Sequence, residues 1–210
     1  MTKADKQKLS EQPNFSRKKL EGLIEVIKKN DTLYEVMTLI MDLNIRRPMI
    51  KYVANNLKGE LVGAEIGTFE GENAKNMLKH LSIKHLYLID PYISYSEFSH
   101  KSGENIPKAY NLAQKRVKRF NEKISFLRKK SEEAIDDISK DLDFVYIDGN
   151  HAYEYAKKDI EMYYPKVKKG GVIGGHDVWN QDVYRAVKEF SEKKNLKPII
   201  KYPDFWFVKP

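Results

Sequence analysis

The chain has 210 residues, which suits one domain of ordinary size and is too short for two independent catalytic domains. Its hydrophobic fraction of 41% excludes a disordered chain, and no stretch approaches the roughly 18 consecutive apolar residues of a membrane span. The first residues, MTKADKQKLSEQPNFSRKK, lack the apolar centre of a signal peptide, so we expect a cytoplasmic protein. Cysteine is absent, which excludes disulfides, thiolate nucleophiles and cysteine-ligated metals. Any metal must bind to Asp, Glu, His or water.

The formal net charge is +8, and the excess of basic residues is spread over the chain. One dense basic block runs from Lys115 to Lys130, with eight Lys or Arg residues and the single acid Glu122. We favour a solvated helix face for this block, because basic runs are commonly surface, over a patch that binds phosphate groups.

Amphipathic helices are predicted in the N-terminal part of the chain. Apolar residues recur at helical spacing in 20–27 and again in 33–41, and a third helix is predicted from about Pro48 to Asn56. We expect 1–57 to form a helical cap or lid, and 58–210 to form the main domain.

From residue 61 onward, short apolar runs that end in acidic residues or glycine alternate with longer helical segments. The predicted strands are Leu61–Ile66, His85–Asp90, Ile124–Leu127, Leu142–Asp148, Gly171–Gly175, Pro198–Tyr202 and Phe205–Val208. The predicted helices between them lie near 72–82, 107–120, 131–138, 153–165 and 180–194. Because the last two strands are joined by little more than Pro203-Asp204, they form a hairpin. This order predicts an α/β fold: a Rossmann-like, seven-stranded, mostly parallel sheet with one antiparallel strand, helices on both faces and an N-terminal helical appendage.

The first predicted strand ends in a glycine turn that runs from Gly67 to Gly71. In open parallel sheets, ligands bind at the carboxyl ends of the strands, and glycine lets them approach the backbone. Glu65 at the end of this strand can receive the amino group of a ligand. Asp90 ends the second strand and can hydrogen-bond both hydroxyls of a ribose, or merely cap its loop. The turn is neither a G-x-G-x-x-G motif nor a phosphate loop, which disfavours a nucleotide-binding oxidoreductase.

Acidic and histidine side chains follow the fourth and fifth predicted strands. Asp148 ends the fourth strand, and His176 and Asp177 end the fifth, so they are expected to converge beside the first pocket. The carboxylates suit Mg²⁺ and His176 favours Mn²⁺; the alternative is that His176 and Asp177 cap the next helix. His151, three residues beyond Asp148, has an ordinary pKa of about 6.5 and can serve as a general base, or it is a surface histidine.

The segments EIGTFEG at 65–71, DGNH at 148–151 and GGVIGGHD at 170–177 resemble those of class I S-adenosylmethionine-dependent methyltransferases of the methyltransferase 24 type. Catechol and macrolide-sugar O-methyltransferases are related to this type, and the resemblance covers about 58–208. It implies methylation of a hydroxyl group on a sugar or other small molecule, with S-adenosylmethionine as cofactor and a divalent metal, Mg or Mn.

The resemblance also implies roles for individual residues. These are Glu65, Gly67, Phe69, Gly71 and Asn73 for the methionine part of the cofactor; Asp90 for its ribose; Ser131 for its adenine; Asp148, His176 and Asp177 for the metal; and His151 for the catalytic base, which is a lysine in catechol-type enzymes. Asp148 is thereby expected to border the cofactor, bind the metal and act with His151 in catalysis.

The acceptor is expected to lie under a lid formed by the N-terminal helices and by the segment Tyr92–Pro107. Within that segment Tyr92, Tyr95 and His100 are candidates for contact with a sugar or an aromatic ring, or for packing of the loop. The expected partner is a small-molecule or sugar acceptor and not a membrane. Whether the chain forms a homo-oligomer is left open by the sequence.

Two other functions stay open. One is an RNA or protein methyltransferase that uses the basic block 115–130, although Asp148-Gly149 stands where enzymes that methylate base amino groups carry an Asn/Asp-Pro-Pro-Tyr/Phe motif. The other is a non-catalytic module that binds the cofactor or RNA, since a fold does not determine a function.

Overall fold

The computed structural model describes residues 47–93 and 106–210, which all fall in one compact unit, Arg46–Pro210. The helices predicted in 20–27 and 33–41 lie outside the described residues, as do most of the predicted cap and the segment 94–105 with Tyr95 and His100. In the part of the chain that is described, no helix is long and apolar enough to cross a membrane.

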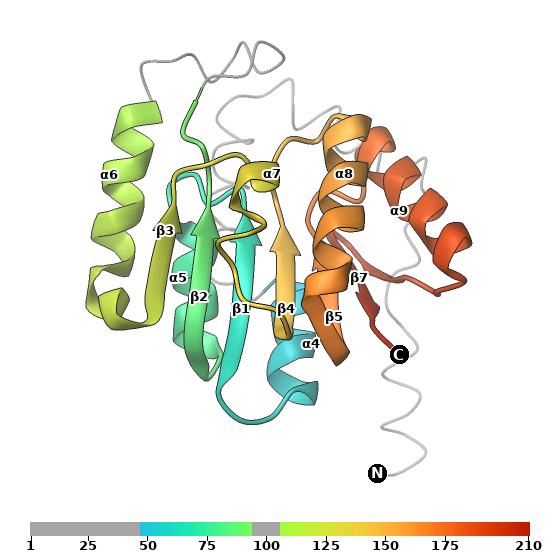
Figure 1. Ribbon diagram of the computed structural model, residues 1–210, viewed down its shortest axis with the longest axis horizontal. Helices are drawn as coiled ribbons and strands as arrows, with labels where there is room; N and C mark the ends of the chain where they lie inside the picture. Colours follow the sequence, from blue (N-terminus) through green and yellow to red (C-terminus); the bar gives the residue numbers. More distant parts are fainter. Residues whose placement is uncertain (1–46, 94–105) are drawn as a thin grey trace, which may run out of the picture. The chain divides into compact units, whose positions relative to one another are not determined.

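Seven strands form one sheet in the order β3-β2-β1-β4-β5-β7-β6 (Figure 1). The strands are β1 Leu61–Ile66, β2 Ile83–Ile89, β3 Ile124–Leu127, β4 Leu142–Ile147, β5 Val167–Gly175, β6 Ile199–Lys201 and β7 Asp204–Val208. Strands β1 to β5 pair in parallel, whereas β7 pairs antiparallel with both β5 and β6. The predicted fold class, a mostly parallel sheet with one antiparallel strand, is confirmed.

Helices cover both faces of this sheet; Figure 1 shows α8 and α9 in front of it and α4 and α5 behind it. The helices of one face are α4 Pro48–Asn56, α5 Glu72–His80 and α6 Ile106–Val117, and those of the other are α7 Ser131–Ala134, α8 Tyr153–Tyr163 and α9 Gln181–Lys194. The 3₁₀ turns η1 Lys118–Lys123 and η2 Tyr164–Lys166 extend α6 and α8.

Two elements have boundaries that differ clearly from the predicted ones: β5 begins earlier and α7 ends earlier. Strand β5 begins at Val167, four residues before the predicted start, because Val167 already pairs with Leu142 across a bulge whose inserted residues 168–170 are exposed. Helix α7 ends at Ala134 and not near 138, and the chain continues in turns through residues that are poor helix formers, Asp-Asp-Ile-Ser.

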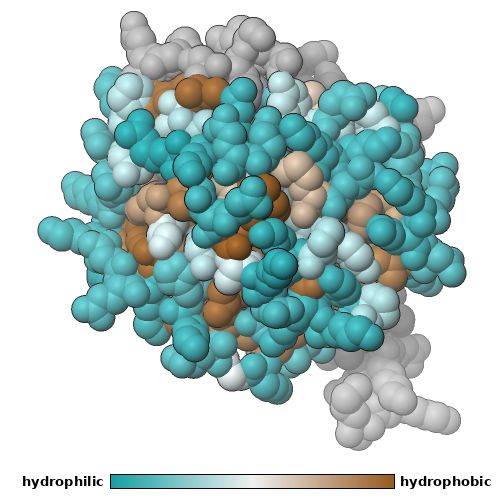
Figure 2. Space-filling model, in the orientation of Figure 1, coloured by the Kyte–Doolittle hydropathy of each residue, from teal (hydrophilic) through white to brown (hydrophobic). Residues whose placement is uncertain are grey.

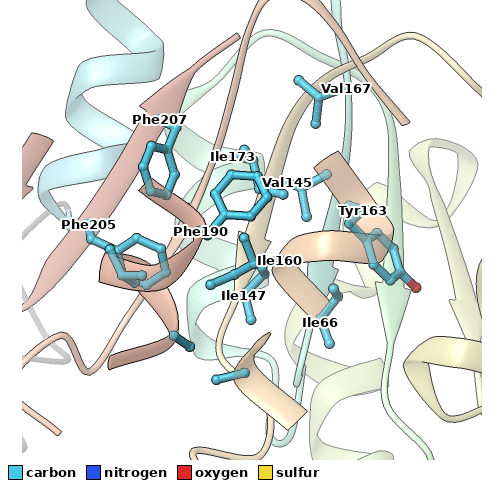
Figure 3. Packing of buried hydrophobic residues seen from close by; sticks show 14 of the residues in the cluster. Ile66, Val145, Ile147, Ile160, Tyr163, Val167, Ile173, Phe190, Phe205 and Phe207 are labelled. Atoms are coloured by element: carbon cyan, nitrogen blue, oxygen red, sulfur yellow. The ribbon is translucent and has the colours of Figure 1, made fainter. Parts of the chain in front are cut away.

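The larger of two cores lies between the sheet and helices α7, α8 and α9. Figure 3 shows Phe190 of α9 against Phe207 of β7, with ring centroids 5.2 Å apart, and Ile160 of α8 close to Ile147 of β4. On the face seen in Figure 2, hydrophobic residues form small separate areas between hydrophilic ones, so polar side chains largely cover this core. The second core, on the opposite face, is closed by α4, α5 and α6.

Alternation along the strands decides which side chains reach each face. Tyr146 of β4 belongs to the core under α4 and α5, whereas its neighbours Val145 and Ile147 belong to the other core. Glu65 of β1 pairs in register with Tyr146, so both side chains lie on the α4 and α5 face of the sheet. The polar residues at the strand ends are therefore held by a rigid, buried scaffold.

Candidate functional site

The carboxyl ends of β1, β4 and β5 lie at one edge of the sheet. Backbone hydrogen bonds continue one residue past the strands: Asp148 N–H donates to the carbonyl of Ile66 at 2.7 Å, and His176 N–H to that of Ile147 at 3.0 Å. Asp148 thus lies between the glycine loop that follows β1 and the His176-Asp177 pair that follows β5.

The glycine loop has two positions that other residues do not fit. Gly67 has φ +85°, and a Cβ added there would lie 2.1 Å from the carbonyl oxygen of Asp148. Gly71, before the first residue of α5, has φ +77°, and its Cβ would lie 3.0 Å from Cα of Ala113. Both backbones adopt the left-handed conformation and pass close to another backbone, which only glycine tolerates without strain. The loop forms a tight cradle at the end of β1.

Glu65 has a buried carboxyl group, with only 1% of the residue exposed. Its Oε1 accepts a hydrogen bond of 2.9 Å from the side-chain amide of Asn73, and Oε2 has no hydrogen-bond partner among the described residues. Burial raises the pKa of Glu65 to about 8, although the hydrogen bond from Asn73 acts in the opposite direction. The carboxyl group is available to a cationic ligand.

Asp90 joins the loops that follow β1 and β2. It accepts hydrogen bonds from the backbone N–H groups of Phe69 at 2.8 Å and Tyr92 at 2.7 Å, and the Tyr92 hydroxyl donates to the Phe69 carbonyl at 3.0 Å. Burial raises the pKa of Asp90, and these backbone hydrogen bonds partly offset that effect. Phe69 and Tyr92 both have positive φ, 44° and 51°. Asp90 therefore fixes the shape of the rim between the two strands.

Ser131 opens α7 at the end of the loop that follows β3. Its hydroxyl donates to Asp159 Oδ1 of α8 at 2.5 Å, and its carbonyl accepts a hydrogen bond of 2.8 Å from the Tyr163 hydroxyl. Asp159 is 4% exposed, and burial raises its pKa to about 7 while the Ser131 hydrogen bond lowers it. A buried acid thus anchors the residue predicted to lie near adenine.

Two carboxylates and two histidines meet beyond the ends of β4 and β5. His151 Nε2 lies 2.7 Å from Asp177 Oδ2 and 3.9 Å from Asp148 Oδ1. His176 Nδ1 lies 2.9 Å from Asp177 Oδ1 and 3.8 Å from Asp148 Oδ1. The structure therefore brings all four residues into one cluster, which we call the Asp-His cluster.

The charges in the Asp-His cluster alter the titration of its members. Burial alone lowers the pKa of His151, but hydrogen bonds to Asp148 and Asp177 outweigh it and raise the pKa to about 9. Burial alone raises the pKa of each carboxyl, yet Arg47 holds the pKa of Asp148 below its usual range and His151 does the same for Asp177. With both carboxylates ionised, a pKa of about 9 keeps a proton on His151 at neutral pH.

Arg47 is a member of this site that the sequence did not reveal. Its Nη1 lies 2.5 Å from Asp148 Oδ2 and donates to the Tyr146 hydroxyl at 3.1 Å. The Tyr146 hydroxyl donates to Asp204 Oδ1 at 2.8 Å, and Asp204 Oδ2 accepts the backbone N–H of Met49 at 2.9 Å. The beginning of α4 is thus tied to the end of β4 through buried polar groups.

A small cavity adjoins the Asp-His cluster between α8, α9 and the ends of β4 and β5. Its volume of about 10 Å³ is the room of roughly one water molecule. It is lined by Ile147, Gly149, Asn150, His151, Ala156, Ile160, His176, Val183 and Phe205. Its polar lining consists of Asn150 and the two histidines of the Asp-His cluster, and the other side chains belong to the core.

Comparison with known proteins assigns a family to this site. A family model described as a methyltransferase domain, methyltransferase 24, matches residues 64–178, more than half of the chain. The chain belongs to the methyltransferase 24 family. The matched range contains the glycine loop, Asp90 and the whole Asp-His cluster.

The proteins similar to this member of the methyltransferase 24 family are described in different ways. The uncharacterized protein R132 of Acanthamoeba polyphaga mimivirus is 31% identical over 153 residues, which cover 67% of this chain and 64% of that protein, so the chain spans less than two thirds of this relative. The O-methyltransferase NovP is similar with a TM-score of 0.54, 19% identity and 76% of each chain covered. An rRNA methylase from Streptococcus thermophilus has a TM-score of 0.53 and 14% identity, over 78% of this chain and 96% of that one. At such identities the likeness shows the fold and leaves the acceptor undecided.

The Asp-His cluster of this family member has the donors that a divalent cation needs. Asp148, His151 and Asp177 each offer one ligand atom, and these atoms all lie within 4.8 Å of one another. Two carboxylate oxygens and one imidazole nitrogen suit Mg²⁺ or Mn²⁺. From the sequence we expected His176 to bind the metal together with the two carboxylates. In the structure, the three residues whose ligand atoms lie this close together include His151 in place of His176. His176 contacts the other oxygen of Asp177.

Of the residues that sequence reasoning missed in this family member, Asp159 could have been found. Ala156, Ile160 and Tyr163 are spaced as the buried face of α8, and Asp159 lies on that face. An acid at a core position needs a partner and is a signal for a polar network. Arg47 carries no such signal, because its partner Asp148 is 101 residues away in the chain.

Proposed function

We propose that the chain is an S-adenosylmethionine-dependent methyltransferase that methylates a hydroxyl group of a sugar or other small molecule with the help of a divalent cation. The observation that carries this proposal is the placement of Glu65 and the Asp-His cluster at the ends of adjacent strands. A site for a cationic ligand and a site for a divalent cation would thereby lie next to each other.

The residues of β1 and β2 fit the cofactor. The Glu65 carboxyl group, buried and with one oxygen unpartnered among the described residues, would receive the ammonium group of its methionine part. Gly67 lets the glycine loop pass directly against the backbone of Asp148, where a Cβ would collide with the carbonyl oxygen. Asp90 would hold the ribose and Ser131 would lie near the adenine, with Phe69, Gly71 and Asn73 around the loop. When bound, S-adenosylmethionine supplies a methyl group on a positive sulfonium that needs no further activation.

The Asp-His cluster fits the acceptor side of the reaction. Asp148, Asp177 and His176 would hold the cation, which supplies Lewis acidity toward the acceptor hydroxyl. His151 faces both carboxylates and would take the hydroxyl proton once positive charge beside them lowers its pKa. The protein contributes mainly positioning, because the rigid strand ends hold both halves of the site in register. We further propose that the N-terminal segment before α4, together with residues 92–107, forms the lid, and that the protein acts in the cytoplasm.

Titration calorimetry with S-adenosylmethionine, with and without Mn²⁺ or Mg²⁺, tests the cofactor and the metal separately. We expect micromolar binding that is lost in Asp90→Ala, and a response to the cation that is lost in Asp148→Asn. A screen of phenols and sugars for formation of S-adenosylhomocysteine then identifies the acceptor class. Absence of S-adenosylmethionine binding under every condition would contradict the proposal.

A further inference from the structure

Arg47 lies directly before α4, on the same face of the sheet as Glu65. It occupies the N-cap position of α4, followed by Pro48, which fixes the first turn of the helix. Its guanidinium carbon lies 5.5 Å from the centre of the Tyr146 ring, and Tyr146 is the register partner of Glu65 on the adjacent strand. Arg47 and Glu65 therefore border the same end of the sheet.

Among the described residues, only part of the Arg47 guanidinium has hydrogen-bond partners. Of its five N–H groups, those on Nη1 serve Asp148 and Tyr146. Within 47–93 and 106–210, no acceptor forms a hydrogen bond with Nε or Nη2. Such a free edge matches the two oxygens of a carboxylate in geometry and in charge.

Glu65 can bind the positively charged group of the same ligand. Its Oε2 is buried and has no hydrogen-bond partner among the described residues, so a cationic donor is missing there. Burial raises the pKa of Glu65, and the positive charge of Arg47 acts on it in the opposite direction. Glu65 can therefore bind the ammonium group of an amino acid, and the remaining N–H groups of Arg47 can bind its carboxylate.

We propose that Arg47 binds the carboxylate of the amino-acid part of the cofactor, while Glu65 binds its ammonium group, so that the two residues form a site for a zwitterion. This inference rests on the proposed function and extends it to a residue outside the matched family range, 64–178. Arg47 keeps its contact with Asp148 through Nη1 and uses Nε and Nη2 for the ligand. The cofactor thereby links the beginning of α4 to the end of β1.

A different role for Arg47 gives a different result. If Arg47 were only the counter-charge of Asp148, its loss would weaken every ligand of the site to the same degree, whether or not the ligand has a carboxylate. A ligand that lacks only the carboxylate separates the two roles. Decarboxylated S-adenosylmethionine is such a probe, because it keeps the adenosyl group, the sulfonium and the amine.

The experiment measures binding of both compounds to the full chain by titration calorimetry. We expect the wild-type protein to bind S-adenosylmethionine roughly 10- to 100-fold more tightly than the decarboxylated compound. In Arg47→Gln this preference disappears, and in Arg47→Lys, which keeps the charge and loses the planar fork, part of it remains. Equal weakening of both compounds in Arg47→Gln, or equal affinity of both for the wild type, overturns the inference.

Controls distinguish this inference from the proposed function and from misfolding. Wild-type protein that binds neither compound refutes the proposed function and the inference with it, whereas binding of S-adenosylmethionine without any preference refutes the inference alone. The wild-type comparison needs no variant and so does not depend on the folding of Arg47→Gln. Arg185→Gln removes a guanidinium from the exposed face of α9, where it pairs with Glu189, and should leave both affinities unchanged.

Discussion

The side chains of His151 and Asp177 contact each other directly, with Nε2 of the histidine 2.7 Å from Oδ2 of the carboxylate. Asp177 reaches this position from a left-handed backbone conformation, with φ 59°. Its other oxygen lies 2.9 Å from His176 Nδ1. Asp177 therefore joins the loop after β4 to the loop after β5, and the Asp-His cluster depends on it.

Replacement of Asp177 by Asn should weaken the cation site. The amide keeps the shape of the side chain but removes a negative charge and one oxygen ligand, so we expect binding of Mn²⁺ to weaken at least roughly tenfold. Electron paramagnetic resonance of free Mn²⁺ measures this loss directly. Asp136→Asn, which removes an exposed carboxylate after α7, is the matched control and should bind as the wild type does. Unchanged Mn²⁺ binding by Asp177→Asn would show that the cluster holds no cation.

The strand ends are predictable from the sequence because they follow local rules. Asp148 ends an apolar run, and Gly67 follows another, so the pattern of apolar residues alone places both at the carboxyl edge of a parallel sheet. Arg47 could not be placed in this way, because nothing local distinguishes it from neighbouring basic residues. Its role arises only when folding brings together residues 101 positions apart.

Geometry also separates residues that look alike in the sequence. His151 and His176 both follow strands, and their positions in the chain do not show that each of them faces both carboxylates, His151 through Nε2 and His176 through Nδ1. Asp177 lies between the two histidines with a positive φ, a backbone conformation that the apolar pattern of the sequence does not specify. The helix predicted at 131–138 ends at Ala134 in the structure, because the turns that follow α7 have a sequence that resembles one more helical turn.

Binding of S-adenosylmethionine should release a proton from Glu65. The pKa of about 8 keeps this carboxyl largely protonated at pH 7, whereas the ammonium group of the cofactor favours the carboxylate. We therefore expect release of ~0.9 proton per ligand at pH 7 and almost none above pH 9, where Glu65 is already ionised. Titration calorimetry in phosphate and in Tris, which differ in ionisation enthalpy, gives the number of protons.

The Glu65→Gln variant provides the control for this proton release. It cannot lose a proton at this position, so its apparent binding enthalpy should be the same in both buffers once other groups are accounted for. Its affinity should fall roughly tenfold or more, because an amide does not neutralise the ammonium group. Equal wild-type enthalpies in phosphate and Tris at pH 7 would contradict the role assigned to Glu65.

Asp159 should make the protein less stable as the pH rises. Its folded-state pKa of about 7 lies above its ordinary value of 3.8, so its contribution to stability is present in full below about pH 4 and is lost as the pH rises through 7. Asp159→Asn removes this dependence. Relative to the variant, the wild type should lose about 2–4 kcal/mol of unfolding free energy between pH 4 and pH 8. Urea denaturation at several pH values measures the difference, which should be absent when Asp136→Asn is compared with the wild type.

Gly59 and Gly67 have nearly the same φ but different surroundings. Replacing each by alanine therefore separates the cost of backbone strain from the cost of a steric collision. Gly59 has φ +83° and Gly67 has φ +85°, but a Cβ at residue 59 meets nothing within 4 Å, whereas one at residue 67 lies 2.1 Å from the carbonyl oxygen of Asp148. Gly59→Ala should therefore cost about 1 kcal/mol for its conformation alone. Gly67→Ala adds a collision between backbones and should cost about 3 kcal/mol or more, with loss of S-adenosylmethionine binding. Thermal unfolding and calorimetry of both variants check this, and equal costs would show that the cradle at the end of β1 can yield.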